Sequence, residues 1–182
     1  MSWNRSRNMA VCGLLTATSI VLARLFSFMI PIGGVGAMRL GFGSLPVVMA
    51  GIMLGPAAGG AVGMLADVVG YTINPMGGAY IPHLTVIAAI TGIVPGLVVR
   101  LLKRGPLTFR TILLAVTAGQ FLSSLVLTPY VLYRVLHIPF WVNVPLRVVA
   151  QCILIPTYSV VVYAVQARVG ASPRAHACAK TR

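Results

Sequence analysis

Long apolar segments dominate this sequence and restrict its possible folds to those that suit a membrane. Between Ile138 and Gln166 the one charged residue is Arg147, and comparable apolar stretches recur along the chain. An apolar stretch of about 20 residues has the length of a transmembrane helix, which satisfies its own backbone where lipid offers no hydrogen-bond partner. The 182 residues are 58% hydrophobic and 8% charged, which is too apolar for a soluble globular domain. We therefore expect an all-α integral membrane protein, with residues 1–182 forming a single transmembrane domain.

The apolar pattern predicts six transmembrane helices in one bundle, at residues 9–29, 41–55, 57–73, 83–101, 111–133 and 142–166, with a basic tail at 167–182. The region 41–73 is short for two crossings and is interrupted by Pro46 and by Gly55-Pro56. If it crosses twice, both termini and the loop around Lys103 share one side, which then holds ten of the fourteen Lys and Arg residues. Cytoplasmic loops carry an excess of these residues, so we expect both termini and the tail in the cytoplasm.

The remaining basic residues lie in the outer half of the membrane in this topology. The formal charge of +13 comes from basic residues that punctuate apolar spans, without the basic and aromatic runs of a nucleic-acid-binding face, so we expect no nucleic acid partner. Four arginines, Arg24, Arg39, Arg134 and Arg147, face a single acid, Asp67. Arg24 and Arg134 could reach outer lipid phosphates with their long side chains. The surplus of positive charge suggests a cavity, open to the outside, that takes an anionic ligand.

Several classes of catalytic protein are disfavoured by what the sequence lacks. One acid, Asp67, cannot supply the aspartate pair of an intramembrane protease, and neither a GxSG-type nucleophile element with a partner His nor a Walker A loop occurs. His83 is a lone histidine, and Cys12, Cys152 and Cys178 are scattered without a CxxC pair, which argues against a metal site and against disulfides. We expect no enzyme and no cofactor. A ligand-capturing transport subunit and a small anion channel both remain compatible with these residues.

Small residues recur at helical spacing in two places. One stripe starts at Gly51 and continues through Gly55, Gly59, Gly63, Ala66 and Gly70. A shorter one, Gly13-x-x-x-Ala17, lies on the first predicted helix. Small residues spaced in this way let helix backbones approach closely in a membrane. The pair on the first helix could face a neighbour within the chain or another subunit.

The predicted external loops differ from ordinary connectors because they are apolar and aromatic. They cover residues 30–43, 74–83 and 137–145, and the last of them contains Trp141. Such loops could pack over a binding site as a lid, whereas Trp141 could equally belong to the aromatic belt at the membrane interface.

Three segments in order carry a family resemblance. Residues 39–70 contain an R-x-GF-x-x-LP motif followed by G-x-x-x-GP and G-x-x-x-G-x-x-x-D-x-x-G, residues 75–82 contain P-x-GGA-aromatic-x-P, and residues 139–147 contain PFW-x-x-x-P-x-R. Together with their spacing, these motifs resemble the substrate-binding S components of energy-coupling factor (ECF) vitamin transporters, most closely the folate family. The likeness covers most of residues 9–166. Ala150 and Gln151 stand where family members often carry a basic or polar pair, and His83 stands at a position typical of a small residue.

The resemblance implies a six-helix bundle in the bacterial cell membrane that binds its vitamin from outside. It further implies docking on a transmembrane coupling subunit that carries two ATPases, which agrees with the missing Walker A loop. The family docks through a small-residue motif on its first helix, so Gly13 and Ala17 become the candidate docking residues. S components for pantothenate or a queuosine precursor share the same general frame and remain alternatives to folate.

Folate suits the charges and aromatic residues of this chain. Its glutamate tail is dianionic and would be held by arginines, and its pteridine ring offers a flat face for aromatic stacking. Asp67 could accept two N–H donors from the amino-pyrimidine edge, or could instead pair with an arginine as a structural bridge. The candidate substrate-binding residues are therefore Arg39, Asp67, Tyr80, His83, Phe140, Trp141 and Arg147.

Overall fold

The computed structural model describes backbone at residues 2–25, 27–32, 35–73, 82–102, 108–136 and 140–170, and describes side chains at 8–24, 41–73, 82–102, 108–134, 144–145 and 147–168. The described helices are α1 (Ser2–Leu25), α2 (Ser44–Leu54), α3 (Pro56–Ile73), α4 (Pro82–Leu102), α5 (Phe109–Gln120), the π-helix η1 (Phe121–Leu127), α6 (Thr128–Leu136) and α7 (Phe140–Gly170). Two strands, β1 (Ser27–Ile32) and β2 (Val35–Gly41), lie between α1 and α2.

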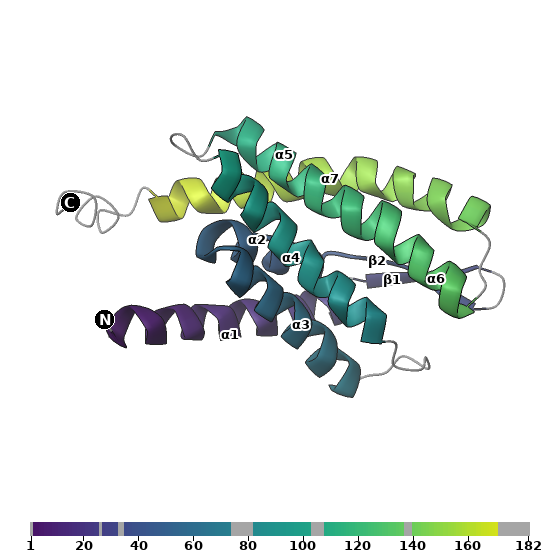
Figure 1. The fold of residues 1–182 in the computed structure, drawn as a ribbon, viewed down its shortest axis with the longest axis horizontal. Helices are drawn as coiled ribbons and strands as arrows, with labels where there is room; N and C mark the ends of the chain where they lie inside the picture. The colour runs from purple at the N-terminus through teal and green to yellow at the C-terminus, as the bar shows by residue number, and fades with distance from the viewer. Residues whose placement is uncertain are drawn as a thin grey trace.

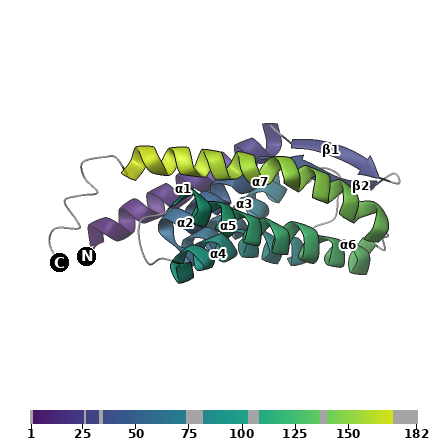
Figure 2. The same cartoon turned by 90° about the horizontal axis from the view of Figure 1, so that it is seen from above.

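The helices form an elongated bundle whose long axis is shared by most of them (Figure 1). The start of α1 and the end of α7 lie at the same end of this bundle in both views, and the two strands lie toward the other end (Figures 1 and 2). Three helical stretches of the described chain are long and apolar enough to cross a membrane: Pro82–Leu102, Phe109–Arg134 and Arg147–Arg168. The apolar helical stretches Asn8–Arg24 and Ser44–Leu54 are shorter. The expected class of helical membrane protein is confirmed at this level.

The strands correct the expectation of an all-α fold and of a loop at 30–43. β1 and β2 pair in antiparallel fashion, with Ser27 opposite Gly41 and Ile32 opposite Val35. Because β1 begins at Ser27, α1 ends at Leu25, earlier than the predicted boundary at residue 29. The sequence carries a signal for this hairpin, since two apolar segments flank the dipeptide Gly33-Gly34, which is typical of a two-residue hairpin turn.

Gly55 separates α2 from α3. Its φ of 102° lies in the left-handed region, where a side chain would be strained, so glycine suits the end of α2. Pro56 then occupies the first position of α3, where its missing N–H would have had no helical partner in any case. The interruption at Gly55-Pro56 therefore ends one helix and starts the next.

The stripe of small residues joins α2, α3 and α4. A Cβ added at Gly59 would lie 2.6 Å from the Cα of Gly51, and one added at Gly51 would collide with the carbonyl oxygen of Gly92. Gly63 packs in the same way against the backbone of Ala88. This stripe therefore serves packing within the chain, and its partner on α4 centres on Gly92.

We expect Gly92→Ala to destabilise the protein and Gly13→Ala to leave its stability unchanged. A methyl group on Gly92 has no room beside the backbone of Gly59, and overpacking of this kind costs about 1–3 kcal/mol. A Cβ on Gly13 meets no heavy atom of the described residues within 4 Å. Thermal unfolding of the two purified variants in detergent checks this, and equal melting temperatures for both would contradict the packing described above.

Candidate functional site

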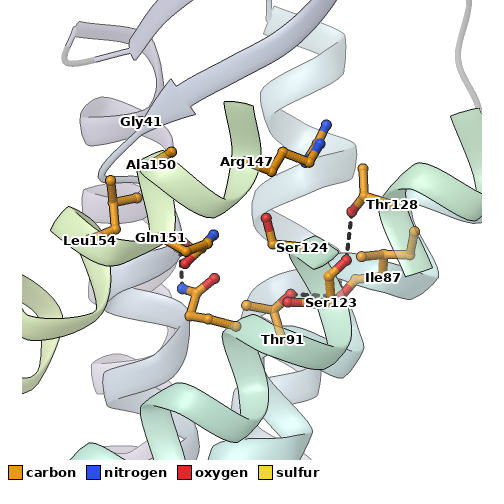
Figure 3. Close-up of a pocket in the computed structure, with 12 residues that line it drawn as sticks. Gly41, Ile87, Thr91, Ser123, Ser124, Thr128, Arg147, Ala150, Gln151 and Leu154 are labelled. Atoms are coloured by element: carbon orange, nitrogen blue, oxygen red, sulfur yellow. Dashed lines mark hydrogen bonds between the residues drawn. The ribbon is translucent and has the colours of Figure 1, made fainter. Parts of the chain in front are cut away.

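A polar cavity of about 150 Å³ lies where α7 faces α5 and η1, and we call it the Arg147 cavity (Figure 3). Its polar lining among the described residues comes from the five consecutive elements α4 to α7 and from the start of α2: Ser44, Thr91, Gln120, Ser123, Ser124, Thr128, Arg147 and Gln151. Ala150 and Leu154 of α7, with Ile87 of α4, supply its apolar wall. So many polar side chains inside an apolar bundle indicate a place where something polar binds.

The π-helix η1 brings hydroxyl groups to this cavity. Single π turns inside α-helices occur often at functional sites, because the wider turn changes which side chains face inward. Here the hydroxyl of Ser123 donates to the carbonyl of Gly119 at 2.7 Å, and the hydroxyl of Thr128 donates to the carbonyl of Ser123 at 2.7 Å. These bonds satisfy backbone carbonyls around the π turn and hold Ser123 and Thr128 at the cavity wall.

Arg147 and Gln151 stand one helical turn apart on α7 and both line the cavity (Figure 3). Gln151 is 7% exposed, and its side-chain oxygen Oε1 is buried with no hydrogen-bond partner among the described residues. A buried acceptor left without a donor costs about 1–3 kcal/mol, so a ligand N–H placed there would recover that cost. Arg147 is half-buried and supplies N–H donors only. The cavity thus suits a ligand that carries both donors and acceptors.

A chain of hydrogen bonds connects the lining residues Gly41, Ser44 and Gln120. The phenol of Tyr158, which is fully buried, donates to the carbonyl of Gly41 at 3.0 Å. Its single hydrogen is then used, so the hydroxyl of Ser44, 2.9 Å away, donates to the phenol oxygen. The amide nitrogen of Gln120 lies 3.5 Å from the same Ser44 hydroxyl, which is a long contact. These bonds connect α5, α2 and α7 to the end of β2.

A second cavity of about 350 Å³ adjoins the first, and we call it the Arg24 cavity. Among the described residues the two have five lining residues in common: Gly41, Ser44, Ile87, Thr91 and Thr128. The charged side chains that the described residues place in its wall are those of Arg24 on α1 and Asp67 on α3. The Oδ2 atom of Asp67 accepts a hydrogen bond of 2.6 Å from the hydroxyl of Thr85 on α4.

The position of Arg24 corrects the interpretation that this residue reaches lipid phosphates. Its guanidinium turns into the bundle and donates from Nη2 to the carbonyl of Gly70 on α3. Arg134, in contrast, is exposed and lies over the ring of Tyr130, with 5.7 Å from the guanidinium carbon to the ring centroid. Of these two arginines, only Arg134 has the exposed position expected of an arginine at the membrane surface.

The structure separates the predicted site residues into two groups. Arg147 lines the Arg147 cavity and Asp67 lines the adjoining Arg24 cavity, and the side-chain hydrogen bond that the structure gives Asp67 comes from Thr85. His83 is exposed in the first turn of α4 and lines neither cavity.

The other predicted site residues fall partly or wholly outside the described part of the chain. Tyr80 lies outside the described residues. The backbone of Arg39 pairs with Met29 in the hairpin, and Phe140 and Trp141 begin α7, while their side chains are outside the described part of the chain. The contacts of these four side chains remain predictions.

Sequence reasoning missed Arg24, Gln120 and the serines of η1 as cavity residues, and it treated Gln151 only as a departure from the family pattern. A signal for the two glutamines was present, since each is an amide inside an apolar span, where a polar side chain faces the bundle interior. No signal assigned Arg24 to the interior, because an arginine near a helix end is equally able to reach the membrane surface.

Gly13 and Ala17 lie on an exposed face of α1. The same helix contacts α2 and α3 through its other face, where Thr16 and Ser19 are buried and Ser19 donates to the carbonyl of Gly43 at 2.6 Å. The small pair is therefore not used for packing among the described residues. The described residues therefore give no support to packing within the chain, and docking on another subunit stays a prediction.

Three comparisons relate the chain to known proteins. A sequence model described as "ECF-type riboflavin transporter, S component" matches residues 4–169. The folate transporter FolT of Clostridium novyi (strain NT) is 31% identical over 155 residues, which is 85% of each chain. The solved structure of FolT bound with folic acid superposes with a TM-score of 0.70 at 26% identity, covering 85% of this chain and 89% of the other. The S component for biotin from an ECF-type ABC transporter superposes with a TM-score of 0.68, covering 91% and 94%, and its 18% identity shows a shared fold alone.

Proposed function

This chain belongs to the S components of ECF transporters, and from that premise we propose that it captures folate outside the cell for ATP-driven uptake. The folate assignment is supported by the similarity to FolT and to the structure of FolT bound with folic acid. As an S component it is a substrate-binding subunit of a transporter rather than an enzyme. We infer that it resides in a bacterial plasma membrane and docks on a transmembrane coupling subunit with two ATPases. Those ATPases would supply the energy, because the chain has no Walker A loop of its own.

The observation that carries this proposal is that Arg147 and the buried amide of Gln151 both line one cavity. A pterin ring presents ring nitrogens and a carbonyl as acceptors and an amino group as a donor. Arg147 would donate to the acceptors, and the unpaired oxygen of Gln151 would accept from the donor edge. Phe140, Trp141 and Tyr80 remain the proposed stacking partners of the ring, and Arg39 a proposed partner of the glutamate tail.

The size of the two cavities also supports an elongated ligand. Pockets for small molecules commonly measure about 300–1,000 Å³, and the Arg147 cavity of about 150 Å³ is below that range on its own. The adjoining Arg24 cavity adds about 350 Å³ beyond a common wall. A folate that placed its pterin at Arg147 would therefore extend past Ser44 and Thr91 into the second cavity.

Competition binding tests the substrate. We expect labelled folate bound to the purified protein to be displaced by unlabelled folate, but not by riboflavin or pantothenate at the same concentration. Riboflavin is the important competitor, because the family description names it and because its ring system also carries donors and acceptors. Displacement by riboflavin at lower concentration than folate would overturn the folate assignment while leaving the family unchanged.

We also propose six membrane crossings with both termini cytoplasmic. The placement of the start of α1 and the end of α7 at one end of the bundle supports an even number of crossings (Figure 1). α2 has 11 residues and so spans about 16 Å, roughly half of the hydrocarbon thickness. The segment 35–43 would complete that crossing. Gly41 within this segment lines both cavities. Non-helical backbone is tolerated at membrane depth where it lines a cavity.

Cysteine labelling checks this topology. In a variant lacking Cys12, Cys152 and Cys178, we expect a single cysteine at Gly77 to react with an impermeant thiol reagent added to intact cells. A single cysteine at Lys103 is the matched control and should react only after the cells are opened. Labelling of position 77 from inside alone would contradict six crossings.

A further inference from the structure

Arg24 is placed in the interior of the bundle although its guanidinium makes one hydrogen bond among the described residues. It lies in the last turn of α1 and lines the Arg24 cavity. Nη2 donates to the carbonyl of Gly70, while Nε is buried and has no hydrogen-bond partner among the described residues. A hydrogen bond that only joins α1 to α3 would need no more than a neutral donor. An arginine inside a membrane protein is always charged, and its insertion costs free energy. The guanidinium is therefore poised for a further acceptor.

The one acid near this cavity does not fill that role on its own. Asp67 stands one turn before Gly70 on α3, and its Oδ2 is engaged by the hydroxyl of Thr85 at 2.6 Å. With Arg24 and Asp67 in one cavity and Arg147 in the next, the described residues give the joined space two arginines against one carboxylate. The balance is positive, and the donor that still lacks a partner belongs to Arg24.

From this placement we infer that Arg24 binds a carboxylate of the folate glutamate tail, while Arg147 and Gln151 hold the pterin ring at the other end. A planar carboxylate accepts two N–H bonds from a guanidinium in parallel, which makes it a well-fitting partner for Arg24 in the wall of this cavity. The wall common to the two cavities lets one ligand reach both ends. This inference rests on the proposed folate function and adds a site for its anionic end.

A thermodynamic cycle tests the inference by changing the residue and the ligand separately and together. Binding of folate is compared with binding of its diamide, in which both glutamate carboxylates are carboxamides, for wild-type protein and for Arg24→Gln, Arg147→Gln and Arg134→Gln. We expect wild-type protein to prefer folate about ten- to a hundredfold, because a charge-assisted contact is lost with the diamide. Arg24→Gln should reduce that preference at least several-fold by weakening folate alone, and Arg39 remains a proposed partner of the tail.

The controls separate this role from other effects of losing an arginine. Arg147→Gln should weaken folate and diamide by the same factor, so the preference survives. Arg134→Gln removes an exposed arginine that lies on Tyr130, and both affinities should equal those of wild type. If Arg24→Gln does not fold, Arg24→Lys keeps the charge without the planar fork, and we expect a preference for folate reduced at least several-fold.

Each result bears on one of the two proposals. An Arg24→Gln protein that keeps the full preference for folate would overturn the inference. So would an equal loss of both ligands together with a lower melting temperature, which would make Arg24 only a tie between α1 and Gly70. Wild-type protein that bound neither compound would overturn the folate function, and the inference with it. Wild-type protein that bound both equally would overturn the inference alone.

Discussion

Replacing Arg147 with glutamine is expected to weaken folate binding about ten- to a hundredfold, while the protein still inserts into the membrane and still docks on its coupling subunit. The factor corresponds to the loss of a charge-assisted hydrogen bond of about 1.5–3 kcal/mol in a partly dry site. Arg147→Lys should restore little, because a point charge does not reproduce a planar fork of donors. Equilibrium binding by calorimetry in detergent measures this, with Arg134→Gln as the control for losing an arginine at an exposed position.

The competing account makes Arg147 one half of a structural bridge with Asp67. Against it, Asp67 accepts from Thr85 at 2.6 Å, and the two charged residues line different cavities. If a bridge existed, Arg147→Gln and Asp67→Asn would each lower the melting temperature, and the double variant would regain both stability and affinity. We expect no such recovery. A double variant with wild-type folate affinity would end the ligand-contact role of Arg147.

Replacing Gly13 or Ala17 with tryptophan is expected to abolish uptake in cells and to leave ligand affinity unchanged. Both residues lie on an exposed face of α1, and a Cβ on Gly13 meets no heavy atom of the described residues within 4 Å. Added volume there would separate this subunit from a partner without reaching either cavity, because small residues are what permit close helix contact in a membrane. The measurement pairs radiolabelled folate uptake with binding to the isolated subunit.

A matched variant tells docking from a general effect of bulk in the membrane. Val149 on α7 is 66% exposed, so Val149→Trp adds an aromatic ring to another outward face. We expect uptake by this variant to remain near that of wild type. If Val149→Trp blocked uptake as strongly as Gly13→Trp, the docking role of the small pair would lose its support. If Gly13→Trp weakened ligand binding as much as uptake, the pair would instead belong to packing within the subunit.

Part of this fold could be predicted because certain residues are compatible with only one local structure or environment. Gly55-Pro56 ends one helix and starts another, and the structure places the boundary there. Arg147 could be predicted to face a polar space, since a charge in an apolar span must turn away from lipid. The family could be predicted from ordered motifs across most of the chain, and the comparisons confirm it.

What could not be predicted has a physical reason as well. Lipid-facing and buried positions of a membrane helix are both apolar, so the apolar pattern does not say which face of α4 meets Gly51, and Gly92 went unnoticed. The hairpin was missed because its strands are as apolar as the helices beside them, although Gly33-Gly34 is a signal for its turn. Arg24 could equally reach lipid or the interior from a helix end, and only its contact with Gly70 distinguishes the two.

The central claim is that this S component captures folate, and the small molecule that accompanies the purified protein tests it most directly. The solitary subunit is extracted in detergent from cells grown in rich medium, and the bound compound is released and identified by mass spectrometry. The account predicts folate or a folate derivative from wild-type protein, and much less of it from Arg147→Gln purified in parallel. Recovery of riboflavin or pantothenate in its place, or anion flux through liposomes from a protein that carries no ligand, would contradict the account.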